Sequence, residues 1–130
     1  MDNLHIEESK GVFSNPEITL NKSTGECNIE GESYLEDAYE FYQPVFDWVA
    51  AYAQQMQQTL TWNFRLSYFN SSSEKVIADL LMMLKEYITQ GGSVKINWYY
   101  PSEIDDILSQ GKYYKILTEL PIELIAYKLA

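Results

Sequence analysis

The sequence contains one cysteine, Cys27, and one histidine, His5. A disulfide within the chain is therefore excluded, as is a zinc site built from several cysteine and histidine ligands. A Ser-His-Asp triad would depend on His5, which lies in a polar segment (1–15) that we expect to be a flexible lead-in. The chain also has no GxxxxGK[ST], GxGxxG or HExxH motif. We therefore expect no enzymatic activity, no cofactor and no metal.

Basic residues are scarce as well, with 9 Lys and Arg against 19 Asp and Glu, so the net charge is −10. Such a chain repels phosphate backbones and anionic lipids, and we expect neither a nucleic-acid nor a membrane partner. No apolar run approaches the ~20 residues that span a bilayer. The first eight residues lack the basic and apolar regions of a secretory signal. These features indicate a soluble, cytoplasmic protein.

The apolar fraction of 46% in 130 residues favours one folded domain, expected over 16–130. Alternating patterns predict five strands, and apolar residues at helical spacing predict three helices between them. The expected order is ββαβαβαβ, an α/β (α+β) domain with a mixed sheet. The middle strands keep one polar face, so the helices are expected on one face of the sheet only. The strands are predicted at 17–20, 26–30, 60–68, 94–99 and 122–127, and the helices at about 34–56, 72–89 and from Pro101.

Local signals suggest where these helices begin and end. Ser33 followed by Glu36 is a capping-box pattern at the start of the first helix. Pro44 predicts a break there, with a longer helical segment starting at the proline. Ser102 is the expected cap of the third helix. The pair Gly91-Gly92 is expected to stop the second helix.

Three consecutive serines, Ser71, Ser72 and Ser73, lie where the strand at 60–68 passes into a helix. Ser71 with Glu74 fits an ordinary capping box, which needs no function. The same position has unpaired backbone N–H groups and the positive end of the helix dipole, both of which favour a phosphate. Only one hydroxyl is needed for a cap, and Asn70 could also serve. Both interpretations therefore stay open on spacing alone.

Four segments together resemble the SiaC family of bacterial regulatory phosphoproteins. They are GESY (31–34), YEFYQPVFDW (39–48), YFNSSS (68–73) and VKINWYY (94–100), and the likeness extends from about 17 to 127. Two features depart from the family pattern. The phosphoacceptor, usually threonine, is serine here, and the Tyr-Pro-Glu that commonly opens the first helix is Tyr34-Leu35-Glu36.

The resemblance implies a STAS-like fold and a phosphorylation switch. It implies a partner serine/threonine kinase, a PP2C-type phosphatase and, in the unphosphorylated form, binding to a diguanylate cyclase that affects cyclic di-GMP and biofilm formation. The acceptor position of the family corresponds to Ser71, with Ser72 and Ser73 as fallbacks. We expect Tyr68, Asn70, Ser71, Ser72 and Glu74 to contribute to partner binding. The alternative is a sensor domain that binds a small molecule at the strand–helix rim.

Overall fold

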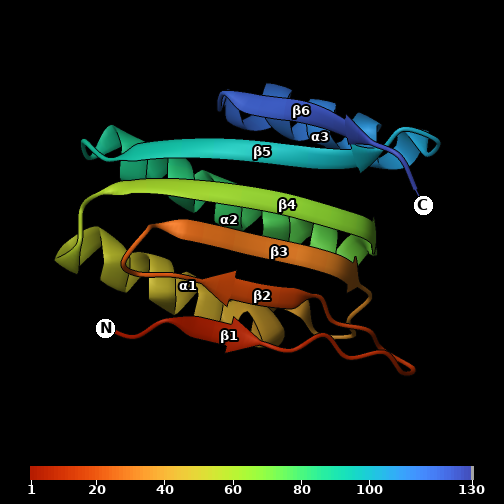
Figure 1. Ribbon diagram of the computed structural model, residues 1–130, viewed down its shortest axis with the longest axis horizontal. Helices are drawn as coiled ribbons and strands as arrows, with labels where there is room; N and C mark the ends of the chain where they lie inside the picture. The colour runs from red at the N-terminus through yellow and green to blue at the C-terminus, as the bar shows by residue number, and fades with distance from the viewer. Residues whose placement is uncertain (130) are drawn as a thin grey trace.

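A six-stranded mixed sheet forms one layer of the computed structural model, which describes residues 1–129 (Figure 1). The strands lie side by side in chain order, from β1 to β6. The first three pair antiparallel, and β3 to β6 pair parallel. Their bounds are β1 (Leu4–Ile6), β2 (Glu17–Leu20), β3 (Glu26–Ser33), β4 (Thr59–Phe69), β5 (Ser93–Pro101) and β6 (Ile122–Tyr127).

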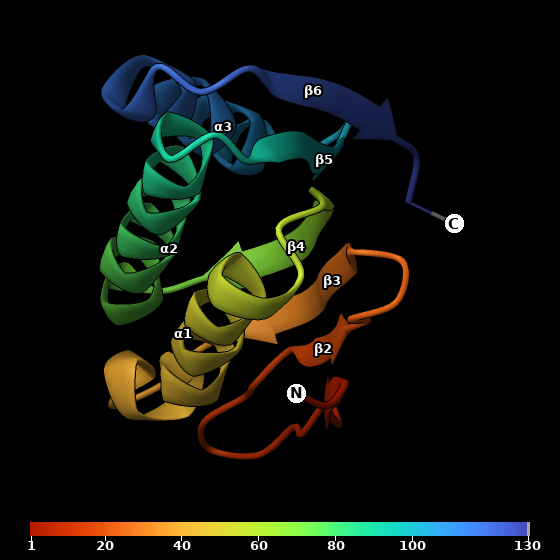
Figure 2. The ribbon, with the colours of Figure 1, turned by 90° about the vertical axis from the view of Figure 1, so that its left-hand side faces the viewer.

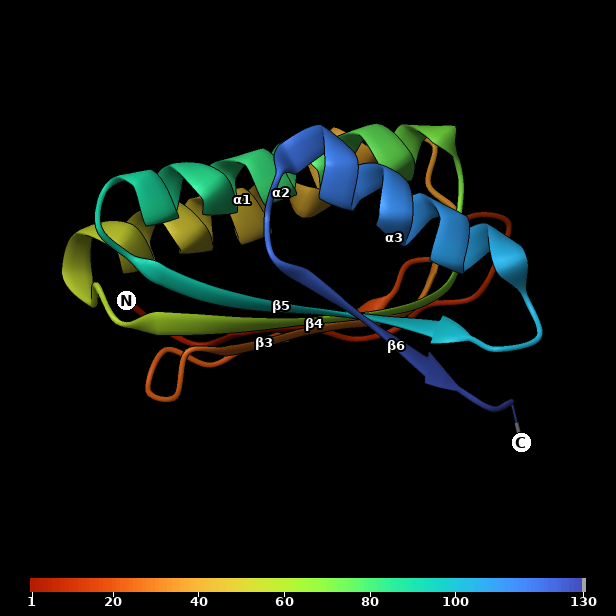
Figure 3. The same cartoon turned by 90° about the horizontal axis from the view of Figure 1, so that it is seen from above.

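Three helices form the second layer, all on the same face of the sheet (Figures 2 and 3). They are α1 (Ala38–Gln55), α2 (Ser71–Thr89) and α3 (Asp105–Thr118). Each one connects two neighbouring parallel strands, and the chain always moves in the same direction across the sheet. Right-handed connections then bring every helix to the same side. The expected α/β domain with helices on one face is confirmed.

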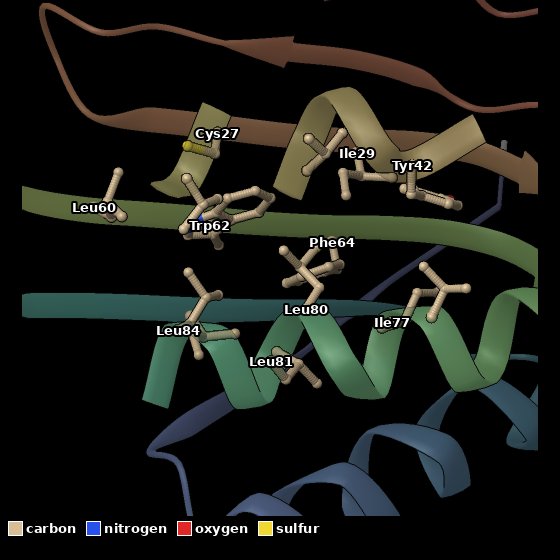
Figure 4. Close-up of a cluster of buried hydrophobic side chains, with 14 of the residues drawn as sticks. Cys27, Ile29, Tyr42, Leu60, Trp62, Phe64, Ile77, Leu80, Leu81 and Leu84 are labelled. Carbon is tan, nitrogen blue, oxygen red and sulfur yellow. The ribbon is translucent and has the colours of Figure 1, made fainter. Parts of the chain in front are cut away.

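The core lies between the helices and the sheet (Figure 4). Alternate side chains of β4, from Leu60 through Trp62 and Phe64 to Leu66, are almost completely buried. They meet the apolar stripe of α2, which includes Ile77 and Leu84. Burial of each such side chain contributes roughly 1.5–3 kcal/mol, so these contacts determine which face of β4 is turned toward α2.

The opposite face of the sheet is open and polar. Asn97 donates to Asn63 at 2.9 Å, and Asn63 donates to Asn28 at 2.9 Å. Asn28 in turn lies 3.4 Å from the hydroxyl of Thr19. These residues are register partners on β2, β3, β4 and β5, so the row of three amides and one hydroxyl crosses four strands. The polar face therefore satisfies many of its own hydrogen bonds.

The segment before Glu17 contains a strand that the sequence pattern did not predict. β1 pairs antiparallel with β2, with Leu4 opposite Leu20. The indole of Trp48 also donates to the carbonyl of Asp2 at 3.0 Å, which joins the N-terminal segment to α1. The expected flexible lead-in therefore adds an edge strand to the sheet, and the order is βββαβαβαβ. β1 was not predicted because a strand of three residues is too short to show an alternating pattern.

The N-termini of the helices were predicted less accurately than their C-termini. Asp37, not Ser33, caps α1: its carboxylate accepts from the backbone N–H of Glu40 at 3.1 Å. α1 also passes through Pro44 without a break. The lost hydrogen bond would have gone to the carbonyl of Glu40 on an exposed part of the helix, where water can replace it.

The start of α3 also differs from expectation. The helix begins at Asp105, and Ile104 occupies the N-cap position without a side-chain hydrogen bond. Ser102 lies in the preceding turn, where its backbone N–H donates to the carbonyl of Tyr127. The first-turn acids Asp105 and Asp106 favour this helix end through the dipole instead. α2 ends as expected, with Gly91 at φ 100° two residues after Thr89.

Candidate functional site at the β4–α2 junction

Asn70, rather than Ser71, is the N-cap of α2. Its side-chain oxygen accepts from the backbone N–H of Ser73 at 3.1 Å. Its amide nitrogen donates to the carbonyl of Leu35 at 2.9 Å. One side chain therefore both caps α2 and joins it to the loop before α1. The capping-box interpretation of Ser71 with Glu74 is wrong, because Ser71 is already the first helical residue.

The three serines have different environments, and Ser73 is the buried one. It is 0% exposed, and its hydroxyl donates to the carbonyl of Ser33 at 2.8 Å. The Ser33 hydroxyl donates to Ser73 Oγ at 2.7 Å and lies 2.9 Å from the Tyr42 hydroxyl. Burial raises the pKa of Tyr42, so this phenol stays a neutral member of the network.

Ser72 is partly buried, and its hydroxyl accepts from the backbone N–H of Ala38 at 3.3 Å. Ser71 is exposed, and its hydroxyl has no hydrogen-bond partner within residues 1–129. A kinase can reach Ser71 without disturbing the junction. Phosphorylation of Ser73 would require α2 to unwind locally and would break two hydrogen bonds. The accessibility of the three hydroxyls thus favours Ser71.

A groove of about 320 Å³ separates α2 from α3 and has Ser71 in its lining. Its walls are Ser71, Glu74, Lys75 and Ala78 of α2, with Tyr113, Tyr114 and Leu117 of α3. The Tyr114 hydroxyl donates to the carbonyl of Glu74 at 2.6 Å and joins the two helices. Tyr113 and Leu117 are 52% and 47% exposed, and the neighbouring Ile116 is 79% exposed. The groove is therefore an open, largely apolar surface beside a free hydroxyl.

The five residues predicted to bind partners are close together but do not share one surface. Ser71 and Glu74 line the α2–α3 groove, whereas Asn70 and Ser72 are occupied in joining α2 to the start of α1. Tyr68 is 50% exposed and its ring packs edge-on against Tyr34, with ring centroids 6.0 Å apart.

The residues predicted to bind partners did not include the α3 side of the groove. One available signal was the position of Ile116 and Leu117. Both lie outside the buried side of α3, which is formed by Ile107, Gly111, Tyr114 and Thr118. Apolar residues at such positions indicate a surface that a partner covers.

The second cavity at this junction, on the side of Tyr68, offers little space for a small molecule. The cavity beside Tyr68, Glu74 and Ile107 is about 160 Å³, below the ~300 Å³ of typical ligand pockets. No three His, Cys, Asp or Glu side chains in the part of the chain that the structure describes could jointly hold a metal ion. Within the same residues, no helix is long and apolar enough to cross a membrane.

The model of the SiaC family of regulatory phosphoproteins matches residues 6–127. The chain belongs to the SiaC family. A protein of Pseudomonas aeruginosa strain UCBPP-PA14, described as uncharacterized, is 36% identical over 100 residues, which cover 77% of each chain. As the family description implies, the chain is a regulatory protein rather than an enzyme.

Solved SiaC structures from Pseudomonas aeruginosa share this fold. Apo-SiaC is 30% identical, with a TM-score of 0.86 over 97% of this chain and 100% of that one. SiaC in complex with the diguanylate cyclase SiaD, which it activates, is 30% identical, with a TM-score of 0.85 over 95% of this chain and 99% of SiaC. The expectation of a SiaC-family member is confirmed.

Proposed function

We propose that the unphosphorylated chain binds and regulates a diguanylate cyclase through the α2–α3 groove, and that phosphorylation of Ser71 ends this binding. The observation that carries the proposal is the position of Ser71: it is the one freely exposed hydroxyl of the serine run, and it lines an open apolar groove. The complex of the related SiaC with its cyclase supports this choice of effector.

The switch requires two enzymes, a serine/threonine kinase and a PP2C-type phosphatase. In the kinase reaction Ser71 Oγ attacks the γ-phosphorus of ATP, ADP leaves, and the hydroxyl proton passes to a base of the kinase. The phosphatase uses water to release inorganic phosphate and restores the hydroxyl. In cells, the level of cyclic di-GMP and biofilm formation would then follow the fraction of chain that is unphosphorylated.

The phosphate would act on the groove more than on the stability of the domain. It adds about −1.5 to −2 charges and three acceptor oxygens at the N-terminus of α2. The helix dipole stabilises such a charge by only about 0.3–1 kcal/mol. Of the two charged residues in the groove lining, Glu74 opposes the charge and Lys75 neutralises part of it. A partner that covers the groove would have to bury this charge beside Ala78 and Leu117, which is strongly unfavourable.

The proposal is tested by incubating the chain with the candidate kinase and Mg-ATP and then mapping the modified residue by mass spectrometry. We expect one phosphate on Ser71, none in Ser71→Ala, and normal modification of the matched variant Ser72→Ala. Binding of the cyclase should weaken at least tenfold on phosphorylation, whereas Ser71→Ala, which removes only an exposed hydroxyl, should weaken it less than twofold. Phosphorylation that persists in Ser71→Ala would contradict the proposal. So would an affinity for the cyclase that is the same with and without the phosphate.

A further inference from the structure

The acidic residues of this chain are distributed unevenly. Residues 23–64 contain seven Asp and Glu and no Lys or Arg. This segment supplies α1 and the loop before it, where Glu36, Asp37 and Glu40 are all exposed. α2 and α3, by contrast, carry lysines as well as acids. The N-terminal end of α1 is therefore the part of the helical layer with a consistent negative charge.

Three exposed aromatic rings lie beside these acids in a row. Phe13 packs on Tyr34 and Tyr34 packs on Tyr68, with ring centroids 6.0 Å apart in both pairs. Each of the three side chains is 42–50% exposed. The row comes from three separate segments of the chain. Its first two members are fixed by the paired backbone hydrogen bonds between Ser14 and Tyr34, at 2.9 and 3.0 Å.

The acids meet Phe13, the first ring of the row, in a hollow on the surface. Its lining consists of Phe13, Glu36, Asp37, Glu40 and Phe41. No basic side chain contributes to this lining, and the three carboxylates form no ion pair with any of residues 1–129. Asp37 caps α1 through a backbone N–H, which leaves its negative charge without a cation. Unpaired carboxylates beside the exposed Phe13 and the half-buried Phe41 match a planar, weakly hydrated cation such as guanidinium.

We propose that this hollow is the docking site for an arginine-bearing segment of a partner protein. The guanidinium would contact the carboxylates of Glu36 and Glu40 and stack against Phe13 or Phe41. Arginine fits better than lysine because its flat, weakly hydrated group stacks on aromatic rings and pairs with two carboxylate oxygens at once. The inference goes beyond the proposed function and does not depend on it, since Ser71 is not part of the lining.

Hydrogen bonds nevertheless connect the hollow to the start of α2, where Ser71, the proposed phosphorylation site, lies. The loop that carries Glu36 accepts a hydrogen bond from Asn70 through Leu35, and the first residue of α1 donates to Ser72. A segment seated in the hollow would therefore lie next to the start of α2. Phosphate on Ser71 would attract a cationic segment, whereas it would repel a partner that covers the apolar groove. The two surfaces are thus expected to respond to phosphorylation in opposite directions.

The test uses a capped tetra-arginine peptide titrated into the unmodified, full-length chain at low salt by calorimetry. We expect saturable binding with one site, weakened at least fivefold in Glu36→Gln/Glu40→Gln. The control Glu26→Gln/Glu30→Gln changes the net charge equally at exposed positions of β3, and it should weaken binding less than twofold. Equal losses in the two variants, or no saturable binding, would overturn the proposal.

Two further measurements distinguish binding at this site from non-specific electrostatic attraction between a cationic peptide and an acidic chain. Phe13→Ala should weaken peptide binding at least threefold, and Tyr113→Ala in the α2–α3 groove should leave it unchanged. Tetra-lysine, with the same charge, should bind more weakly than tetra-arginine. Equal affinity for the two peptides, together with an unaffected Phe13→Ala variant, would contradict the role of the aromatic rings. Circular dichroism of each variant checks that the fold is retained.

Discussion

The hydroxyls of Ser33 and Ser73 lie 2.7 Å apart although the residues are forty positions apart in the chain. Ser33 ends β3, and Ser73 lies in the first turn of α2. Their contact, with the second bond from Ser73 to the carbonyl of Ser33, ties the start of α2 to the neighbouring strand. The exposed Ser71 is therefore held on a rigid support, which suits its proposed role as a residue recognised by a kinase, a phosphatase and an effector.

Replacement of Ser73 should destabilise the domain, whereas replacement of Ser71 should not. Ser73→Ala removes two buried hydrogen bonds and leaves the carbonyl of Ser33 without that donor, which costs about 1–3 kcal/mol of unfolding free energy. Ser71→Ala removes an exposed hydroxyl and should change stability by less than ~0.5 kcal/mol. Urea unfolding of both variants measures the difference, and equal losses would contradict this assignment of roles.

Asn70 offers a separate test, because its two side-chain atoms have different partners. Asn70→Ala loses the cap and the hydrogen bond to Leu35, and should cost about 1–2 kcal/mol. Asn70→Asp keeps an oxygen for the backbone N–H of Ser73 but cannot donate to Leu35. Thermal unfolding should therefore place Asn70→Asp between the wild type and Asn70→Ala. An aspartate variant as unstable as the alanine variant would show that the cap contributes little.

Gly111 should not tolerate a side chain. A Cβ at this position would lie 2.5 Å from Cδ1 of Trp98 and 2.9 Å from Leu124. Both neighbours pack within the core or against it, so Gly111→Ala should destabilise the chain by about 1–3 kcal/mol through overpacking. Gly11→Ala is the matched control, because nothing lies within 4 Å of the position that its Cβ would take. Chemical denaturation should show a large loss for the first variant and almost none for the second.

Stability should fall at alkaline pH because of buried phenols. Burial raises the pKa of Tyr114 above the ordinary value near 10. The unfolded chain then releases this proton first as the pH rises. The stabilisation is therefore complete below pH ~10 and decreases above it, by up to about 1.4 kcal/mol per pH unit for each such tyrosine.

The Tyr114→Phe variant should lose part of this pH dependence. It would also be less stable at neutral pH, because the carbonyl of Glu74 loses its donor. The exposed Tyr113 gives the matched control, and Tyr113→Phe should keep the wild-type slope. Unfolding free energies measured between pH 8 and 11 distinguish the two variants. Identical slopes in all three proteins would argue against the buried phenol as the cause.

The sheet was largely predictable from the sequence, because each of its long strands has one buried and one polar face. β6 was predicted at its observed bounds, and β4 within one residue at each end. Helix starts were less predictable. Several residues near each start can accept from a backbone N–H, and tertiary contacts decide among them. Ser33 had the right spacing for a cap of α1, but its hydroxyl donates a hydrogen bond to Ser73 in α2 instead.

The serine run remains a predicted site, and the surface around it could not be predicted from the sequence. The serine run and its neighbour Glu74 do lie beside a surface groove. The α3 wall of that groove is about forty residues away in the sequence, and no local pattern connects Leu117 with Ser71. The hollow at the start of α1 was not predicted either, because Phe13 reaches it only through the pairing of Ser14 with Tyr34.

The amide row on the open face has a consequence for recognition. Each asparagine in its middle uses one side-chain N–H toward one strand and its oxygen toward the next, so half of its hydrogen-bonding capacity is already taken. A protein that docked there would compete with these bonds for the same amide groups. Under the proposed switch, a partner would therefore approach from the helical side of the molecule, where Ser71 lies.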